Sequence, residues 1–195
     1  MYLIAPLGSR NDLAHLLNAK GLLGQAVEIG THRGAYAGQL LERWQGQTLW
    51  CVDPWGIPPG CESQMKFYDP GGRTREDDYK EVQRLARKHP RLRPLRAVSA
   101  VAVETFTDGT LDFVFVDGDH RRQAVADDLR LWWPKLRPGG ILAGHDIVML
   151  GPWDREDNWG RNVQPAVEEF SIPLGLPVYL IAEGEVWSFY MEKPR

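Results

Sequence analysis

Acidic and histidine side chains follow several apolar runs of this sequence, each at the point where the run ends. In chain order these residues are Asp53, Asp117, Asp119, His120, His145 and Asp146. Carboxylates and imidazoles bind divalent metals, and imidazole also moves protons near neutral pH. The residue types therefore predict acid–base and metal chemistry, provided that the fold brings the ends of these runs together.

The apolar runs alternate with segments of helical period, which predicts an α/β fold in one domain, residues 1–195. Strands are expected at 26–29, 48–52, 92–98, 111–116, 141–143, 178–182 and 186–191. Helices are expected at 9–20, 32–44, 76–89, 101–106, 121–136 and 163–170. Such alternation specifies a mostly parallel, doubly wound sheet with right-handed crossovers. The short connector 183–185 adds an antiparallel hairpin at the end of the chain.

In an open α/β sheet, ligands bind beyond the carboxyl ends of the strands. Asp117 and Asp146 end neighbouring strands in this arrangement, so their backbones are expected roughly 5 Å apart. Two carboxylates that close repel unless a cation or a proton lies between them. Mg²⁺ suits such oxygen ligands, whereas direct binding of His145 would favour Mn²⁺, Fe²⁺ or Zn²⁺.

The turn after the first predicted strand indicates a nucleoside ligand without a pyrophosphate. Gly30 and Gly34 flank this turn, where a missing side chain lets a ligand approach and lets helix and strand pack closely. His32 occupies the position of the middle glycine in a dinucleotide fingerprint, which argues against NAD. Asp53 is well placed to accept hydrogen bonds from ribose hydroxyls, or it begins a turn with Pro54.

Composition excludes several other classes of function. The chain has 195 residues with 23 Lys and Arg against 26 Asp and Glu, so nucleic-acid binding has little electrostatic support. No apolar stretch reaches the roughly 20 residues of a membrane span, and the first residues do not resemble a signal peptide. Two cysteines are too few for a disulfide framework. A cytoplasmic protein with no membrane or nucleic-acid partner is expected, and a homo-oligomer remains open.

The segment 28–34, Asp53 and the terminal hairpin resemble the class I S-adenosylmethionine-dependent methyltransferases. The segments 116–120, 136–140 and 144–146 resemble more narrowly the metal-dependent sugar O-methyltransferases that include macrocin O-methyltransferase, a pattern shared with cephalosporin hydroxylase-like proteins. The resemblance covers nearly the whole chain, and the order and spacing of the motifs make it specific. It implies a Rossmann-like, seven-stranded sheet of strand order 3-2-1-4-5-7-6.

The same resemblance implies where the cofactor and the metal bind. S-adenosylmethionine is expected with its methionine end over Gly30, its ribose on Asp53 and its adenine near Ser99. The expected cofactor-binding residues are Glu28, Gly30, Thr31, Gly34, Asp53, Ser99 and Asp117. A divalent metal, with Mg²⁺ as first choice, is implied at Asp117 and Asp146. His145 stands where many relatives carry another carboxylate, and it is the third candidate ligand.

Methyl transfer from a sulfonium to a hydroxyl requires an aligned oxygen and a group that removes its proton. A metal can fix the hydroxyl and lower its pKa, while a nearby side chain acts as general base. His120 is the first candidate for that base, because the ordinary pKa of histidine, about 6.5, suits neutral pH. Asp119 is the alternative. Either residue could instead cap the helix that begins near Arg121.

Two irregular segments, 54–73 and 147–160, are expected to lie over the active site and to form the acceptor pocket. The predicted function is O-methylation of a hydroxyl on a small sugar, polyol or catechol-like molecule. One alternative keeps the fold without the metal, as an N- or O-methyltransferase. The other is a nucleotide- or partner-binding protein of the same fold without turnover.

Overall fold

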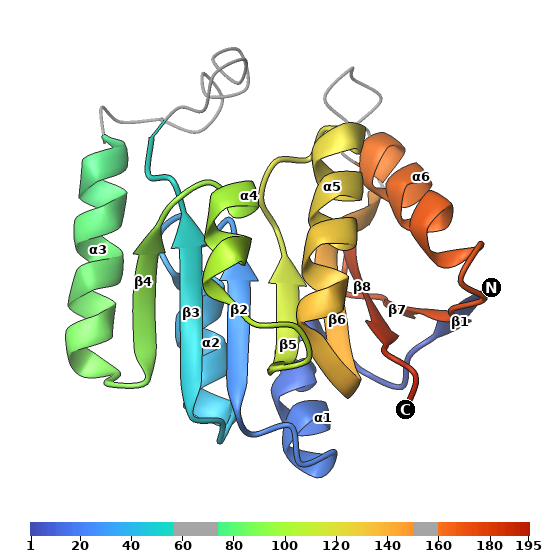
Figure 1. The fold of residues 1–195 in the computed structure, drawn as a ribbon, viewed down its shortest axis with the longest axis horizontal. Helices are drawn as coiled ribbons and strands as arrows, with labels where there is room; N and C mark the ends of the chain where they lie inside the picture. The colour runs from blue at the N-terminus through green and yellow to red at the C-terminus, as the bar shows by residue number, and fades with distance from the viewer. Residues whose placement is uncertain (57–73, 150–159) are drawn as a thin grey trace.

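A computed structural model of the chain describes residues 1–56, 74–149 and 160–195. One sheet of eight strands runs through the centre, with helices on both faces (Figure 1). The strands are β1 (Tyr2–Ile4), β2 (Gln25–Ile29), β3 (Thr48–Asp53), β4 (Leu92–Arg96), β5 (Leu111–Val116), β6 (Leu136–Met149), β7 (Val178–Ile181) and β8 (Val186–Glu192). The helices are α1 (Leu13–Ala19), α2 (Ala35–Arg43), α3 (Arg75–Lys88), α4 (Ser99–Ala102), α5 (Arg122–Trp132) and α6 (Gly160–Ser171).

The sheet order is β1-β7-β8-β6-β5-β2-β3-β4. Seven of these strands follow the predicted order, and β8 is antiparallel to both β6 and β7, as a terminal hairpin requires. The structure corrects the predicted count by adding β1, which pairs in parallel with β7 at the edge. Three residues are too short to show a hydrophobic period, so only the pairing with β7 makes this segment a strand.

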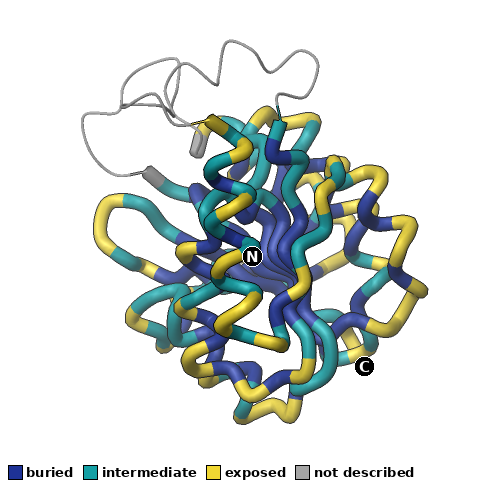
Figure 2. The backbone as a smooth tube through the Cα atoms, turned by 90° about the vertical axis from the view of Figure 1, so that its left-hand side faces the viewer, coloured by how far each residue is buried: buried dark blue, intermediate teal, exposed yellow. Residues whose placement is uncertain are grey.

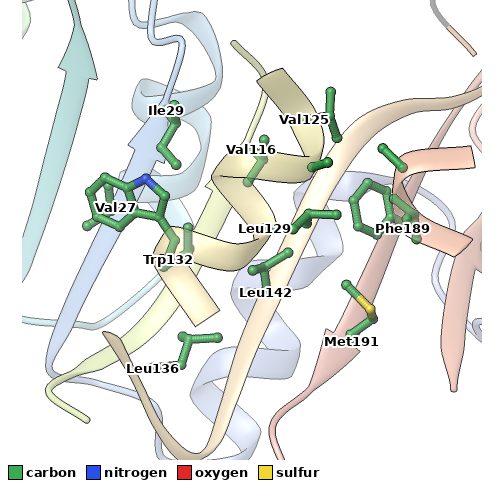
Figure 3. Close-up of a cluster of buried hydrophobic side chains, with 14 of the residues drawn as sticks. Val27, Ile29, Val116, Val125, Leu129, Trp132, Leu136, Leu142, Phe189 and Met191 are labelled. Carbon is green, nitrogen blue, oxygen red and sulfur yellow. The ribbon is translucent and has the colours of Figure 1, made fainter. Parts of the chain in front are cut away.

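Every residue of β5 is buried, and from Phe113 to Val116 its side chains alternate between two apolar cores. Val114 and Val116 pack with residues of α5 and α6 on one face, where Figure 3 shows part of the cluster. Phe113 and Phe115 pack on the other face with residues of α1 and α2. Figure 2 shows the buried strands between the two helical layers. This rigid double core fixes the position of the loop that follows β5.

The strand β6 is longer than the sequence predicts at both ends. Its first residue, Leu136, was expected to end a helix, but α5 ends at Trp132. Pro134 follows in a short 3-10 turn, because proline lacks the N–H that an α-helix needs. Its last residues, through Met149, were expected in the second irregular segment. Pairing with β8 resumes at Val148 opposite Trp187 and extends the strand.

The remaining parts of the two expected irregular segments, residues 57–73 and 150–159, lie outside the described residues. The acceptor pocket predicted there therefore stays a prediction. Among the helices that the structure describes, none combines the length and the apolar character needed to cross a membrane.

Candidate active site

A bulge in β6 carries Asp146 to the carboxyl edge of the sheet. Gly144 pairs with Phe189 and Val148 with Trp187, so four steps along β6 match two along β8. Bulges re-aim side chains in this way. Asp146 has a φ of +58°, a left-handed conformation that is strained for a residue with a side chain and that persists only where the surroundings hold it.

Two histidines contact the buried carboxylate of Asp146. His120 Nε2 lies 2.7 Å from Asp146 Oδ2, and His145 Nδ1 lies 3.1 Å from the same oxygen. Burial alone would raise the pKa of Asp146, but the hydrogen bonds from both histidines outweigh it and hold that pKa well below its usual range. Asp146 is therefore a carboxylate at neutral pH.

Asp117 completes a cluster with His120 and Asp146. Asp117 follows β5 directly, and its Oδ1 lies 3.5 Å from His120 Nε2. One ligand atom from each of the three residues lies within 4.8 Å of the others. Burial opposes the charged imidazole, but hydrogen bonds to Asp117 and Asp146 raise the pKa of His120 to about 10. A protonated imidazole thus sits between two carboxylates at neutral pH.

This cluster fits a divalent metal. The imidazolium supplies the positive charge that the two carboxylates require, and a metal could take over that role when the imidazole loses its proton. The donor atoms are carboxylate oxygens and one imidazole nitrogen, a set that suits Mg²⁺ or Mn²⁺ and, through the nitrogen, Fe²⁺ or Zn²⁺. His145 Nδ1 lies 4.0 Å from Asp117 Oδ1, beside the cluster.

The turn after β2 packs directly against the loop that carries Asp117. Gly30 has a φ of +82°, and a Cβ there would lie only 2.1 Å from the carbonyl oxygen of Asp117. A glycine is therefore required for the two turns to meet. Gly34, at φ +78°, caps the start of α2 in the same turn. The predicted contacts of both glycines with a cofactor stay predictions.

Asp53, at the end of β3, holds the neighbouring turns in place. Its carboxylate accepts the backbone N–H of His32 at 2.9 Å and that of Trp55 at 2.7 Å. Burial raises the pKa of Asp53, and these two hydrogen bonds work against that rise. The expected turn-forming role of this residue is observed, while its expected contact with a ribose is a prediction that the geometry leaves available.

Glu28, on β2, and Thr31, in the turn after β2, are both buried. The side chain of Glu28 is buried, the Cys51 thiol lies 3.8 Å from its Oε2, and burial raises its pKa to about 8. The hydroxyl of Thr31 donates to the Glu28 carbonyl oxygen at 3.4 Å. The hydroxyl of Thr31 thus links the turn after β2 to the end of that strand.

Ser99 and Asp119, two further predicted site residues, form their hydrogen bonds with residues outside the metal cluster. Ser99 Oγ donates to Asp128 at 2.5 Å and accepts from Trp132 Nε1 at 2.7 Å. Asp119 lies outside the three-residue cluster, where its carboxylate accepts the backbone N–H of Arg121 at 2.9 Å and pairs with the guanidinium of the same residue. This bond forms a local turn before α5, whose N-cap is Arg121 without a side-chain cap hydrogen bond, so the capping role weighed for Asp119 is not observed.

The structure also brings two residues to this edge that the sequence analysis missed. Arg10 Nη1 lies 3.7 Å from Asp117 Oδ2. Asp78, buried on α3, contacts the side chains of Arg33, Arg75 and His32. No residue pattern around Arg10 in the sequence marks it as a site residue. Asp78 carries a signal, because it lies four residues before the buried Val82 and so places a charge on the apolar stripe of the helix.

A family model described as a methyltransferase domain matches residues 27–147, more than half of the chain. The chain therefore belongs to this methyltransferase family. The matched range contains the turn after β2, the loop after β5 and the bulge of β6. The resemblance to the class I methyltransferases is confirmed at the level of family and fold.

Solved structures of other proteins share the fold. A protein from Corynebacterium glutamicum superposes with a TM-score of 0.67 at 17% identity, covering 97% of this chain and 84% of that one. The O-methyltransferase TomG of Streptomyces achromogenes, which is involved in tomaymycin synthesis and was solved with S-adenosylmethionine, gives 0.63 at 15% identity, covering 94% and 79%. At these identities the likeness shows the fold.

Two curated relatives carry no assigned activity. Protein R132 of Acanthamoeba polyphaga mimivirus is 24% identical over 164 residues, which cover 84% of this chain and 66% of that protein. Protein y4gI of Sinorhizobium fredii is 27% identical over 155 residues, which cover 72% of this chain and 15% of that protein. The chain thus spans less than two thirds of the length of either relative.

Proposed function

We propose that this protein transfers a methyl group from S-adenosylmethionine to a hydroxyl of a small molecule, with a divalent metal in the site. Membership of a methyltransferase family supports the reaction class. The observation that carries the metal-dependent form is the convergence of Asp117, His120 and Asp146 within 4.8 Å at the carboxyl edge. Sugars, polyols and catechols are the proposed acceptors, because vicinal hydroxyls can replace water on such a metal.

The proposed cofactor position is supported by polar groups that can still form hydrogen bonds. Each carboxylate oxygen of Asp53 accepts one backbone N–H and has a lone pair left for a ribose hydroxyl. The hydroxyl of Ser99 uses its proton and one lone pair, which leaves one acceptor site for the exocyclic amine of adenine. The methionine end would then lie beside Gly30 and Asp117.

The proposed roles of the two histidines differ from the first assignment. Asp117, His120 and Asp146 would hold the metal, which when bound would position the acceptor hydroxyl and lower its pKa. His145 becomes the proposed base. Its Nδ1 bonds to Asp146, which leaves Nε2 as the atom that takes the hydroxyl proton. The hydroxyl oxygen forms its bond to the methyl carbon as the carbon–sulfur bond breaks, and S-adenosylhomocysteine leaves.

Metal removal tests this proposal. Protein treated with a chelator should bind one Mg²⁺ or Mn²⁺ per chain in calorimetry, and methyl transfer to catechol or polyol acceptors should return with the metal. In Asp146→Asn both metal binding and transfer should fall by more than roughly 100-fold, equivalent to the loss of a few kcal/mol of stabilisation. The matched control is Asp127→Asn, which alters a half-exposed carboxylate on α5.

Three results would point elsewhere. Full activity after chelation would support the metal-independent methyltransferase. Binding of S-adenosylmethionine without transfer to any acceptor of a broad panel would support the protein without turnover. Equal metal affinity in Asp146→Asn and the wild type would remove the cluster from the mechanism.

A further inference from the structure

Arg10 is held at the carboxyl edge by the segment between β1 and α1. Its backbone N–H donates to Glu183 Oε2 at 2.9 Å, and its carbonyl oxygen accepts the Tyr36 hydroxyl at 3.3 Å. Its guanidinium carbon lies 5.4 Å from the centre of the Tyr36 ring. The backbone of Arg10 is thus anchored at two points, and its side chain rests on a buried aromatic ring.

The guanidinium of Arg10 has hydrogen-bonding capacity to spare. It carries five N–H donors, and within the described part of the chain its charged partner is Asp117 Oδ2 at 3.7 Å. That distance allows attraction between charges but exceeds the length of a hydrogen bond. The side chain is 27% exposed, so a ligand can reach it.

The two oxygens of Asp117 face different partners. Oδ1 lies 3.5 Å from His120 Nε2 and 4.0 Å from His145 Nδ1, on the side of the metal cluster. Oδ2 lies on the side of Arg10. That second side therefore presents a hydrogen-bond acceptor with negative charge next to a fork of donors with positive charge. An α-amino acid complements this pair, because it carries an ammonium and a carboxylate on one carbon.

We infer that Arg10 and Asp117 bind the amino-acid end of the methyl donor. The guanidinium takes the donor's carboxylate through paired hydrogen bonds, the geometry in which arginine binds carboxylates best. Asp117 Oδ2 takes the ammonium. This inference rests on the proposed function and adds a binding residue to it. Arg10 lies outside residues 27–147, so the family match does not supply this role.

Two ligands separate this role from a general effect on the fold. S-adenosylhomocysteine carries the amino-acid end, while 5′-methylthioadenosine shares the nucleoside and the thioether but lacks it. Calorimetry on the full chain should show that Arg10→Met weakens S-adenosylhomocysteine binding roughly 10- to 100-fold, the value of charge-assisted hydrogen bonds. Binding of 5′-methylthioadenosine should stay unchanged. Arg10→Lys should recover part of the loss, because it keeps the charge without the fork.

Arg130→Met, which removes an exposed arginine of α5, is the matched control and should bind both ligands as the wild type does. Equal affinity of Arg10→Met and the wild type for S-adenosylhomocysteine would overturn the inference and leave the proposed function standing. Equal weakening of both ligands would also overturn it, since the residue would then act through the fold. A wild-type protein that binds neither ligand would overturn the proposed function itself.

Discussion

Two buried carboxylates near the carboxyl edge have partners of different kinds. Asp78 on α3 lies 3.0 Å from Arg33 Nε and 3.4 Å from Arg75 Nη1. It also lies 3.3 Å from His32 Nε2, but burial lowers the pKa of that imidazole, so the arginines supply the positive charge. Asp146, at the bulge of β6, lies instead against the imidazoles of His120 and His145. Both carboxylates are almost fully buried, so each needs positive charge nearby.

The difference lies in whether the positive charge can leave. A guanidinium keeps its proton at any physiological pH, so Asp78 is neutralised permanently and ties α3 to the turn after β2. An imidazole can release its proton, so the charge beside Asp146 can be exchanged for a metal. At these two carboxylates, pairing with arginine ties helix to turn, whereas pairing with histidine alone leaves a site that can change its occupant.

The largest expected effect separates the two histidines around Asp146. His145→Gln should lower the rate of methyl transfer roughly 10²- to 10⁴-fold, the usual contribution of a general base, with metal affinity retained. His120→Gln should weaken metal binding, because it removes a ligand. Metal titration and single-turnover transfer measure the two effects. The opposite pattern, with metal binding lost in His145→Gln, would restore His120 as the base.

A smaller effect is expected at the arginine-paired carboxylate. Asp78→Asn should lower the free energy of unfolding by about 1–3 kcal/mol, because Arg33 and Arg75 lose a charged partner while water still reaches part of their side chains. Urea denaturation measures this loss. Transfer by the folded variant, assayed well below its melting temperature, should stay within a few-fold of the wild type. A stable variant without activity would show that this cluster does more than hold structure.

The smallest expected effect concerns Asp128, a buried carboxyl on α5 that has neutral partners. Burial raises its pKa from 3.8 to about 7, against the hydrogen bond from Ser99. Between these two values the folded protein binds a proton that the unfolded chain releases, so the free energy of unfolding falls as pH rises through this window. Asp128→Asn should remove this contribution and gain about 1–2 kcal/mol relative to the wild type from pH 5 to pH 7. Denaturation at the two pH values checks this, and a constant difference would contradict it.

Local patterns were sufficient to predict most of the fold. The continuous apolar sequence of β5 indicated a strand that is covered on both faces. The alternation of such apolar segments with segments of helical period predicted the parallel sheet. Patterns failed where pairing decides the structure. The strand β1 is too short to show a hydrophobic period and is defined by its pairing with β7. The last residues of β6 are a strand because they pair with β8.

Local patterns in the chain set which residue types stand at the carboxyl edge, because Asp117, His120 and Asp146 lie at or near the ends of apolar runs that are visible without the fold. Which of these side chains meet depends on the folded backbone. The bulge opposite β8 and the positive φ of Asp146 set the distances to the histidines. Arg10 reaches Asp117 from 107 positions earlier in the chain. Such contacts depend on strand register and chain path, which the spacing of residues in a sequence does not encode.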